Sequence, residues 1–143
     1  MYRFIFISFF AILLTETSFS QTTPVSDSTP GNPADKIFDR VEQEAEFPGG
    51  LTAWKIYLQT NLRADVPAKR KAPAGIYPVT VIFIVAKDGK ISNVKAETNL
   101  GYGMEKEVIR IIKKSPNWVP AQQDGRPVNA YRRQPITFVV SEE

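Results

Sequence analysis

Hydrophobic and polar residues alternate most regularly in the middle of the chain, from Tyr77 to Glu97. This stretch has the sequence YPVTVIFIVAKDGKISNVKAE, in which a turn at Asp88-Gly89 separates two apolar runs. β-Branched and aromatic residues favour a pleated strand, and Asp-Gly favours a tight reversal of the chain. The pattern therefore predicts a β-hairpin, and we expect the rest of the chain to pack on it or to extend it.

The length of the hairpin loop decides which residues face each other. A two-residue loop at Asp88-Gly89 gives one register, whereas a three-residue loop with Gly89 in the left-handed region places Val85 opposite Ile91. The second register requires a β-bulge near Ser92-Asn93 to keep Val94 on the buried face, because a slip of one residue exchanges the two faces. We prefer the second register because it also buries Ile91.

Two segments show the spacing of amphipathic helices. From Leu51 to Leu62, apolar residues recur three and four positions apart and make one face, to which Leu51 and Trp54 belong. In Met104–Lys114, acidic residues stand in the first turn and two lysines in the last, as the helix dipole favours. Ser115-Pro116 then ends this second helix.

Proline marks the segments that cannot be helices or central strands. Arg63–Pro78 contains three prolines and Gly75, and is predicted to be an exposed connecting loop. Lys36–Glu46 is either an N-terminal strand lying against the sheet or an ordered approach to the first helix. The pattern alone does not decide between these two alternatives.

A final strand is predicted at about Val128–Val140, after a turn centred on Asp124-Gly125. Ile136, Phe138 and Val140 alternate with Thr137 and Val139, but Pro135 interrupts the run and has no main-chain N–H. The strand should therefore lie at the edge of a sheet at that point. The order helix, hairpin, helix, strand predicts an α+β fold: a two-layer sandwich with a small three-stranded antiparallel sheet and two helices on one face.

The first thirty-five residues differ in composition from the rest. Residues 1–20 combine an early arginine, the apolar run Phe4–Leu14 and the small residues Ser18-Phe19-Ser20, which is typical of a cleaved signal peptide. An uncleaved inner-membrane anchor is the alternative, but the apolar run is only about half of the ~20 residues that a membrane-spanning helix requires. Residues 21–35 are rich in Pro, Ser and Thr and are predicted to be a disordered linker. The folded domain is expected at 36–143.

Composition excludes several classes of function. The 143 residues include no cysteine and no histidine, so no Cys-His pair, Ser-His-Asp triad or typical zinc site can be assembled, and we expect no enzyme, no cofactor and no metal. The net charge of +3 comes from 18 basic and 15 acidic residues that are well mixed. A nucleic-acid-binding protein requires a larger clustered excess, so no nucleic-acid partner is expected.

Several runs in the second half of the chain together resemble one known family. They are the strand–Lys-Asp-Gly–strand unit, the run Trp118-Val119-Pro120-Ala121, the turn Asp124-Gly125-Arg126-Pro127-Val128, and Gln134-Pro135-Ile136-Thr137-Phe138. In this order, and preceded by Phe47-Pro48-Gly49-Gly50, they resemble the TonB C-terminal domain in its Bacteroidetes-type form. The resemblance covers roughly Val41–Val140. The missing histidine and the short linker suggest a free-standing domain rather than a complete energy transducer.

The resemblance implies an interaction domain in the periplasm. TonB domains pair their last strand with a short Ton-box peptide of an outer-membrane transporter, and TonB couples to an ExbB/ExbD-type complex, which this chain would contact at most indirectly. Such β-augmentation uses main-chain hydrogen bonds for affinity and side-chain pockets for selectivity. Carried onto this sequence, the partner-binding residues are Arg132, Arg133, Gln134, Pro135, Ile136, Thr137, Phe138, Val139 and Val140.

A second hypothesis uses the same strand edge differently. In a structural or oligomeric envelope protein, the edge would pair with another copy to form a homodimer, and that contact would cover Ile82 and Ile84 on the second face of the hairpin. Both hypotheses require an open sheet edge.

Overall fold

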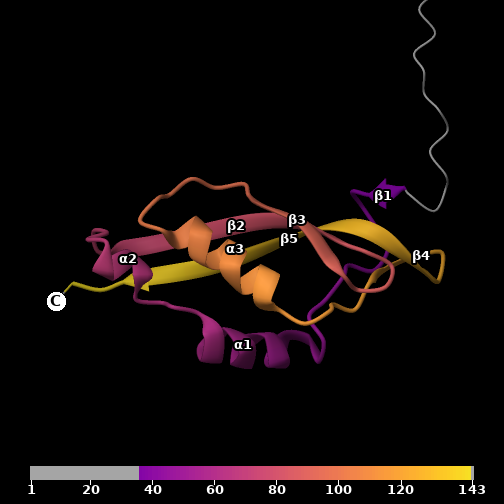
Figure 1. The fold of residues 1–143 in the computed structure, drawn as a ribbon, viewed down its shortest axis with the longest axis horizontal. Helices are drawn as coiled ribbons and strands as arrows, with labels where there is room; N and C mark the ends of the chain where they lie inside the picture. The colour runs from indigo at the N-terminus through magenta and orange to yellow at the C-terminus, as the bar shows by residue number, and fades with distance from the viewer. Residues whose placement is uncertain (1–35, 143) are drawn as a thin grey trace, which may run out of the picture.

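The computed structural model describes residues 36–142 and contains five strands and three helices in this range (Figure 1). The predicted signal peptide (1–20) and linker (21–35) lie outside the described residues. The elements are β1 (Ile37–Phe38), α1 (Gly50–Asn61), α2 (Val66–Lys69), β2 (Gly75–Val85), β3 (Ile91–Ala96), α3 (Met104–Lys114), β4 (Ala121–Gln123) and β5 (Arg126–Val140).

The predicted hairpin is formed by β2 and β3 in the preferred register. Val85 lies opposite Ile91, Gly89 has a φ of 85°, and the register shifts between Ile82 and Ile84, as the expected bulge requires. The bulged residue Asn93 has a φ of 56°. Gly89 is also needed for packing, because a Cβ there would lie 2.3 Å from the main-chain oxygen of Trp118.

The sheet is larger than predicted and is mixed. Its order is β1-β5-β2-β3, with β4 paired to the start of β5. β5 is antiparallel to β2 from Ala130 to Val140 but parallel to β1 at Asn129 and Ala130. The prediction of three antiparallel strands was therefore wrong, because β1 and β4 are only two and three residues long and too short to show alternation.

Helix α3 has the predicted bounds and packs on one face of the sheet, against β2 and β3 (Figure 1). Its buried residues join the alternating inward residues of β2 and β5 in one hydrophobic core. The largest fully buried side chains of the described residues are Phe83, Met104, Ile111, Ile112, Val79, Val81, Val85, Val108 and Pro67.

Helix α1 lies on the same side of the sheet as α3, as expected, but at the margin of the core near β5. It packs through an aromatic cluster, in which Trp54 lies 5.7 Å from Trp118 between ring centroids. The Tyr57 hydroxyl donates a hydrogen bond of 2.9 Å to the main-chain oxygen of Ile111 in α3. Leu51, predicted to be on the buried face, is 68% exposed, because a helix packed along one narrow side buries less of its apolar stripe.

The segment Arg63–Pro78 is also more ordered than the predicted loop. It contains α2, whose early Pro67 is buried, and the first four residues of β2. Proline is tolerated in the first turn of a helix because the N–H groups there have no intrahelical acceptor. None of the helices within residues 36–142 is both long enough and apolar enough to cross a membrane.

Glu107 joins α3 to the end of α1 and is the only buried charged residue among those described, at 5% exposure. Its carboxylate accepts hydrogen bonds from the main-chain N–H of Arg63 at 2.8 Å and from the Arg110 guanidinium at 2.6 and 2.8 Å. Arg110 in turn donates to the main-chain oxygen of Asn61 at 2.8 Å. Burial alone raises the pKa of Glu107, but these hydrogen bonds outweigh it and hold the pKa below its usual range.

Replacing Glu107→Gln is expected to lower the free energy of unfolding by about 1–3 kcal/mol at pH 7, because the charged partner of Arg110 is lost. Since the pKa of Glu107 is lower in the folded protein than in the unfolded chain, its ionised form contributes above the unfolded value of about 4.3. The contribution is lost as the pH falls through the folded pKa. Urea denaturation of both proteins at pH 3 and pH 7 should show a larger difference at pH 7 than at pH 3. An equal difference at both pH values would contradict it.

Candidate functional site: the open edge of β5

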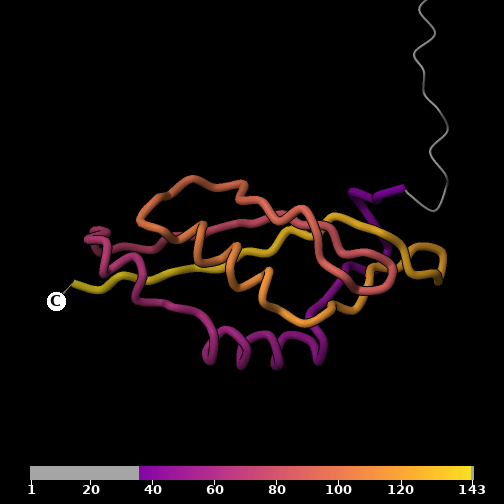
Figure 2. Tube along the Cα trace, viewed as in Figure 1, coloured from indigo at the N-terminus to yellow at the C-terminus, as the bar shows by residue number. Residues whose placement is uncertain are grey.

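One edge of β5 is paired along its length and the other is not. β2 covers the first edge from Ala130 to Val140. On the second edge, β1 pairs only with Asn129 and Ala130. Within residues 36–142 no strand pairs with this edge from Gln134 to Val140, and Figure 2 shows this part of β5 as the far yellow end of the trace.

The hydrogen bonds of Thr80 show which residues of β5 face the open edge. The Thr80 main-chain oxygen accepts from the Glu97 N–H at 2.9 Å and its N–H donates to Thr98 Oγ1 at 3.2 Å, so Thr80 faces away from β5. Its partner in the ladder is Pro135. Because an antiparallel ladder alternates, the main-chain groups of Pro135 must also point away from β2, towards the open edge.

It follows that the odd-numbered residues of β5 present their main-chain groups to the open edge, while the even-numbered ones face β2. Arg133, Thr137 and Val139 each offer an N–H and a C=O there, and Pro135 offers a C=O alone. The missing N–H of Pro135 therefore costs no hydrogen bond within the sheet. The expectation that Pro135 lies at an edge is confirmed.

The nine predicted partner-binding residues do not form one side-chain patch. Ile136, Phe138 and Val140 are buried in the core. On the other face the side chains are exposed, and Val139 with its cross-strand neighbour Ile76 forms an apolar pair, at 67% and 72% exposure. The edge therefore offers a partner main-chain hydrogen-bonding groups, and side chains could contribute contacts only beside the edge.

The N-terminal segment lies against the beginning of this edge. Arg132 Nη1 is 3.1 Å from Glu44 Oε2, and Arg133 bonds both Asp39, at 3.3 Å, and Glu97, at 3.1 Å. The hydrogen bonds to Asp39 and Glu97 raise the pKa of Arg133, which stays positively charged. The pairs of Arg133 are exposed and confer little stability, whereas the Arg132 side chain is partly buried; together they fix where the free edge begins.

Gln134 links the Arg132 side chain to the edge itself. Its Oε1 accepts from Arg132 Nη2 at 3.3 Å, and its Nε2 donates to the main-chain oxygen of Pro135 at 3.2 Å. The second contact confirms that this carbonyl does not face β2. An added strand would have to displace the Gln134 amide from it.

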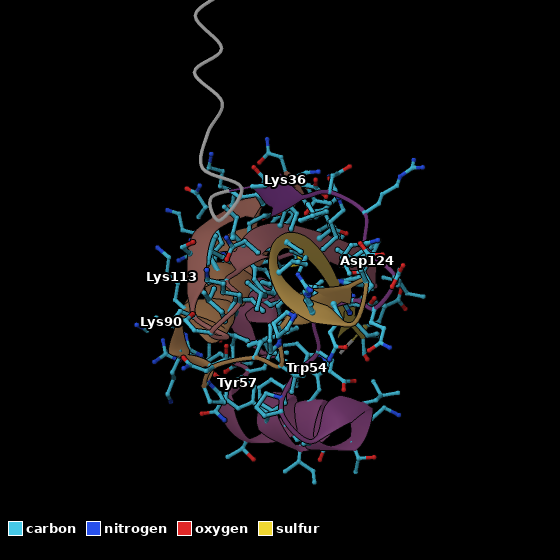
Figure 3. All side chains as sticks on the ribbon, turned by 90° about the vertical axis from the view of Figure 1, so that its right-hand side faces the viewer. Lys36, Trp54, Tyr57, Lys90, Lys113 and Asp124 are labelled. Atoms are coloured by element: carbon cyan, nitrogen blue, oxygen red, sulfur yellow. The ribbon has the colours of Figure 1, made fainter. Side chains whose placement is uncertain are left out.

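A groove of about 160 Å³ runs between α1 and the start of the free edge. Its floor is aromatic, and Figure 3 shows Trp54 and Tyr57 pointing from α1 towards the rest of the domain. Sequence analysis did not predict this site, because its walls come from segments about eighty residues apart. The lining residues are Glu46, Phe47, Gly50, Leu51, Trp54, Trp118, Arg132 and Gln134.

Comparison with known families identifies the family of this chain. A family profile described as Gram-negative bacterial TonB protein C-terminal matches residues 68–140, just over half of the chain. The chain belongs to the TonB C-terminal family. No curated protein matches it. TonB-type domains work in the periplasmic part of the cell envelope in TonB-dependent transport, and membership gives this chain a TonB-like role of that general kind.

The family match covers one part of this TonB-type domain and leaves another part outside it. It includes β5 and the hairpin but begins after α1. The open edge therefore belongs to the matched part, whereas the α1 wall of the groove lies outside it. The groove is a feature of this chain that the family match alone does not provide.

Other candidate sites on the TonB-type domain are weaker. A hollow of about 360 Å³ is bordered by Arg63, Asp65, Val66, Lys69 and Arg70, but it is open and its charged side chains are mixed in sign. Among residues 36–142 no group of three or more acidic side chains is placed to hold a metal ion. The carboxylate of Glu42 accepts hydrogen bonds from the Gln123 side chain and the Asp124 main-chain N–H.

Proposed function

We propose that this domain is a binding module, and not an enzyme, that takes up an extended Ton-box-like peptide of an outer-membrane transporter as an added strand on the open edge of β5. The observation that carries the proposal is the free edge from Gln134 to Val140, held by full pairing with β2 on its other side. The main-chain groups of Arg133, Thr137 and Val139 supply the hydrogen bonds of β-augmentation. Any coupling to an ExbB/ExbD-type complex would be indirect.

Features around the edge oppose uncontrolled aggregation. Pro135 removes one donor, and the charged Arg132 and Arg133 stand at its beginning, where they are already paired with Glu44 and Asp39. Proline and charge are common protections of exposed strands. A short partner strand can still bind, because the N–H and C=O of Thr137 and Val139 remain accessible, and the Pro135 carbonyl becomes accessible once the Gln134 amide is displaced.

Isothermal titration with peptides from the N-termini of outer-membrane transporters of the same organism tests the proposal. We expect binding that is lost when alternate peptide residues, those that face β5, are N-methylated, because each methyl group removes a donor and blocks pairing. N-methylation at the intervening residues is the matched control and should change affinity by no more than about threefold. No binding by any such peptide at millimolar concentration would exclude the proposed function.

A second candidate function is self-association through the same edge in an oligomeric envelope protein. The exposed Ile76–Val139 pair beside the edge favours it, because a second copy would cover this apolar surface. The sequence-based argument for it is weakened, since Ile84 is already buried within one chain and Ile82 is half-buried. Size-exclusion chromatography with light scattering decides the matter: a strict monomer at millimolar concentration removes this candidate.

A further inference from the structure

We propose that the groove between α1 and β5 is a selectivity pocket, which accepts one large aliphatic or aromatic side chain from the added strand. This inference rests on the proposed function and states which strands the edge prefers. The residue that enters the pocket is the one opposite Gln134.

The alternation of side chains along a strand shows why the residue opposite Gln134 is the one that enters the pocket. In an added strand, residues opposite the even-numbered positions of β5 have side chains on the same face as those positions. Gln134 and Arg132 border the groove, whereas Ile136 and Phe138 on the same face are buried in the core. The side chain opposite Gln134 therefore points towards α1 and reaches the groove.

The floor of the groove is apolar and already formed. Phe47, Trp54 and Trp118 are buried, with ring centroids 5.3 Å apart for Phe47–Trp54 and 5.9 Å for Phe47–Trp118. Trp118 Nε1 donates to Ser115 Oγ at 3.0 Å, so its polar atom is satisfied. An apolar cavity of about 150 Å³ can hold benzene, so a groove of about 160 Å³ has room for one branched or aromatic side chain.

Leu51 makes the outer wall and explains why a partner side chain should be apolar. It is 68% exposed although it adjoins the buried aromatic floor. A bound aliphatic or aromatic side chain would remove both its own surface and that of Leu51 from water, whereas a charged one would lose hydration against the aromatic floor and could pair only with the polar rim of Glu46, Arg132 and Gln134. The pocket thus distinguishes between strands that the main-chain edge alone would bind equally.

A pair of exposed substitutions on α1 tests this pocket. Leu51→Glu places a charge at the groove, and Ile56→Glu, at a position 58% exposed and outside the groove lining, is the matched control. With a transporter peptide that binds the wild-type domain, titration should show a loss of about 10- to 100-fold for Leu51→Glu. Ile56→Glu should stay within about twofold. Both variants should melt close to the wild-type temperature.

The peptide provides the reciprocal experiment. Replacing each of its residues in turn by Ala and by Asp should reveal one position of strong loss, and that loss should vanish in the Leu51→Glu domain. A cross-link between Leu51→Cys and a single cysteine moved along the peptide should form at that position, and the chain has no cysteine of its own to interfere.

The outcomes separate the two proposals. Binding that depends on alternate N-methylation but is equal for both variants would overturn the pocket and leave the edge function standing. Absence of binding by every peptide would overturn both.

Discussion

Replacing Trp118→Ala is expected to lower the free energy of unfolding by about 3–5 kcal/mol. The Trp118 ring contacts Phe83 of the sheet at 5.0 Å and Trp54 of α1 at 5.7 Å between centroids. Its main-chain N–H donates to the Gly89 oxygen at 2.9 Å, which fixes the tip of the hairpin. Removing the ring leaves a cavity where sheet, hairpin tip and α1 meet.

Urea denaturation followed by circular dichroism measures this loss. Trp118→Phe is the control, because it keeps an aromatic ring but loses the hydrogen bond to Ser115, and it should cost about 1–2 kcal/mol. We also expect Trp118→Ala to loosen α1, whose contact with the sheet passes through this cluster. A loss below about 1 kcal/mol would contradict the central position given to Trp118.

The sequence predicts most accurately those elements whose conformation is determined by residues within the element itself. The hairpin register follows from Gly89, which alone tolerates a left-handed conformation at the turn, and from the need to bury Ile91. The bounds of α3 follow from its charged ends and Ser115-Pro116. Pro135 predicts an edge because a missing N–H is a property of the residue itself.

The remaining features depend on tertiary contacts. The pairing of β1 involves two residues whose pattern is not distinguishable from an irregular chain. Leu51 matches the apolar stripe of α1, yet the helix packs at the margin of the core and leaves Leu51 exposed. The groove joins α1 to β5, so no local pattern predicts it. For a site made of main-chain groups, side-chain identity is a poor guide: three of the nine predicted residues are core.

Replacing Thr137→Pro is expected to reduce transporter-peptide binding by about 100-fold or more while the domain stays folded. The Thr137 N–H faces the open edge, so the substitution breaks no bond to β2, and Pro135 already occupies an equivalent position two residues earlier. We expect a change of no more than about 1 kcal/mol in the free energy of unfolding. The ring carbon, however, replaces the donor and holds an incoming strand away, so neighbouring main-chain bonds are lost as well.

Thr137→Val is the matched control, because it keeps the N–H and the β-branched shape, and its affinity should stay within about threefold of wild type. Titration gives the affinities and thermal melting followed by circular dichroism gives the stabilities. Unchanged binding by a folded Thr137→Pro domain would show that the partner lies elsewhere. Should the wild-type protein be dimeric and the Thr137→Pro variant monomeric, the same edge would be occupied by a second copy, because only edge pairing depends on a single outward N–H.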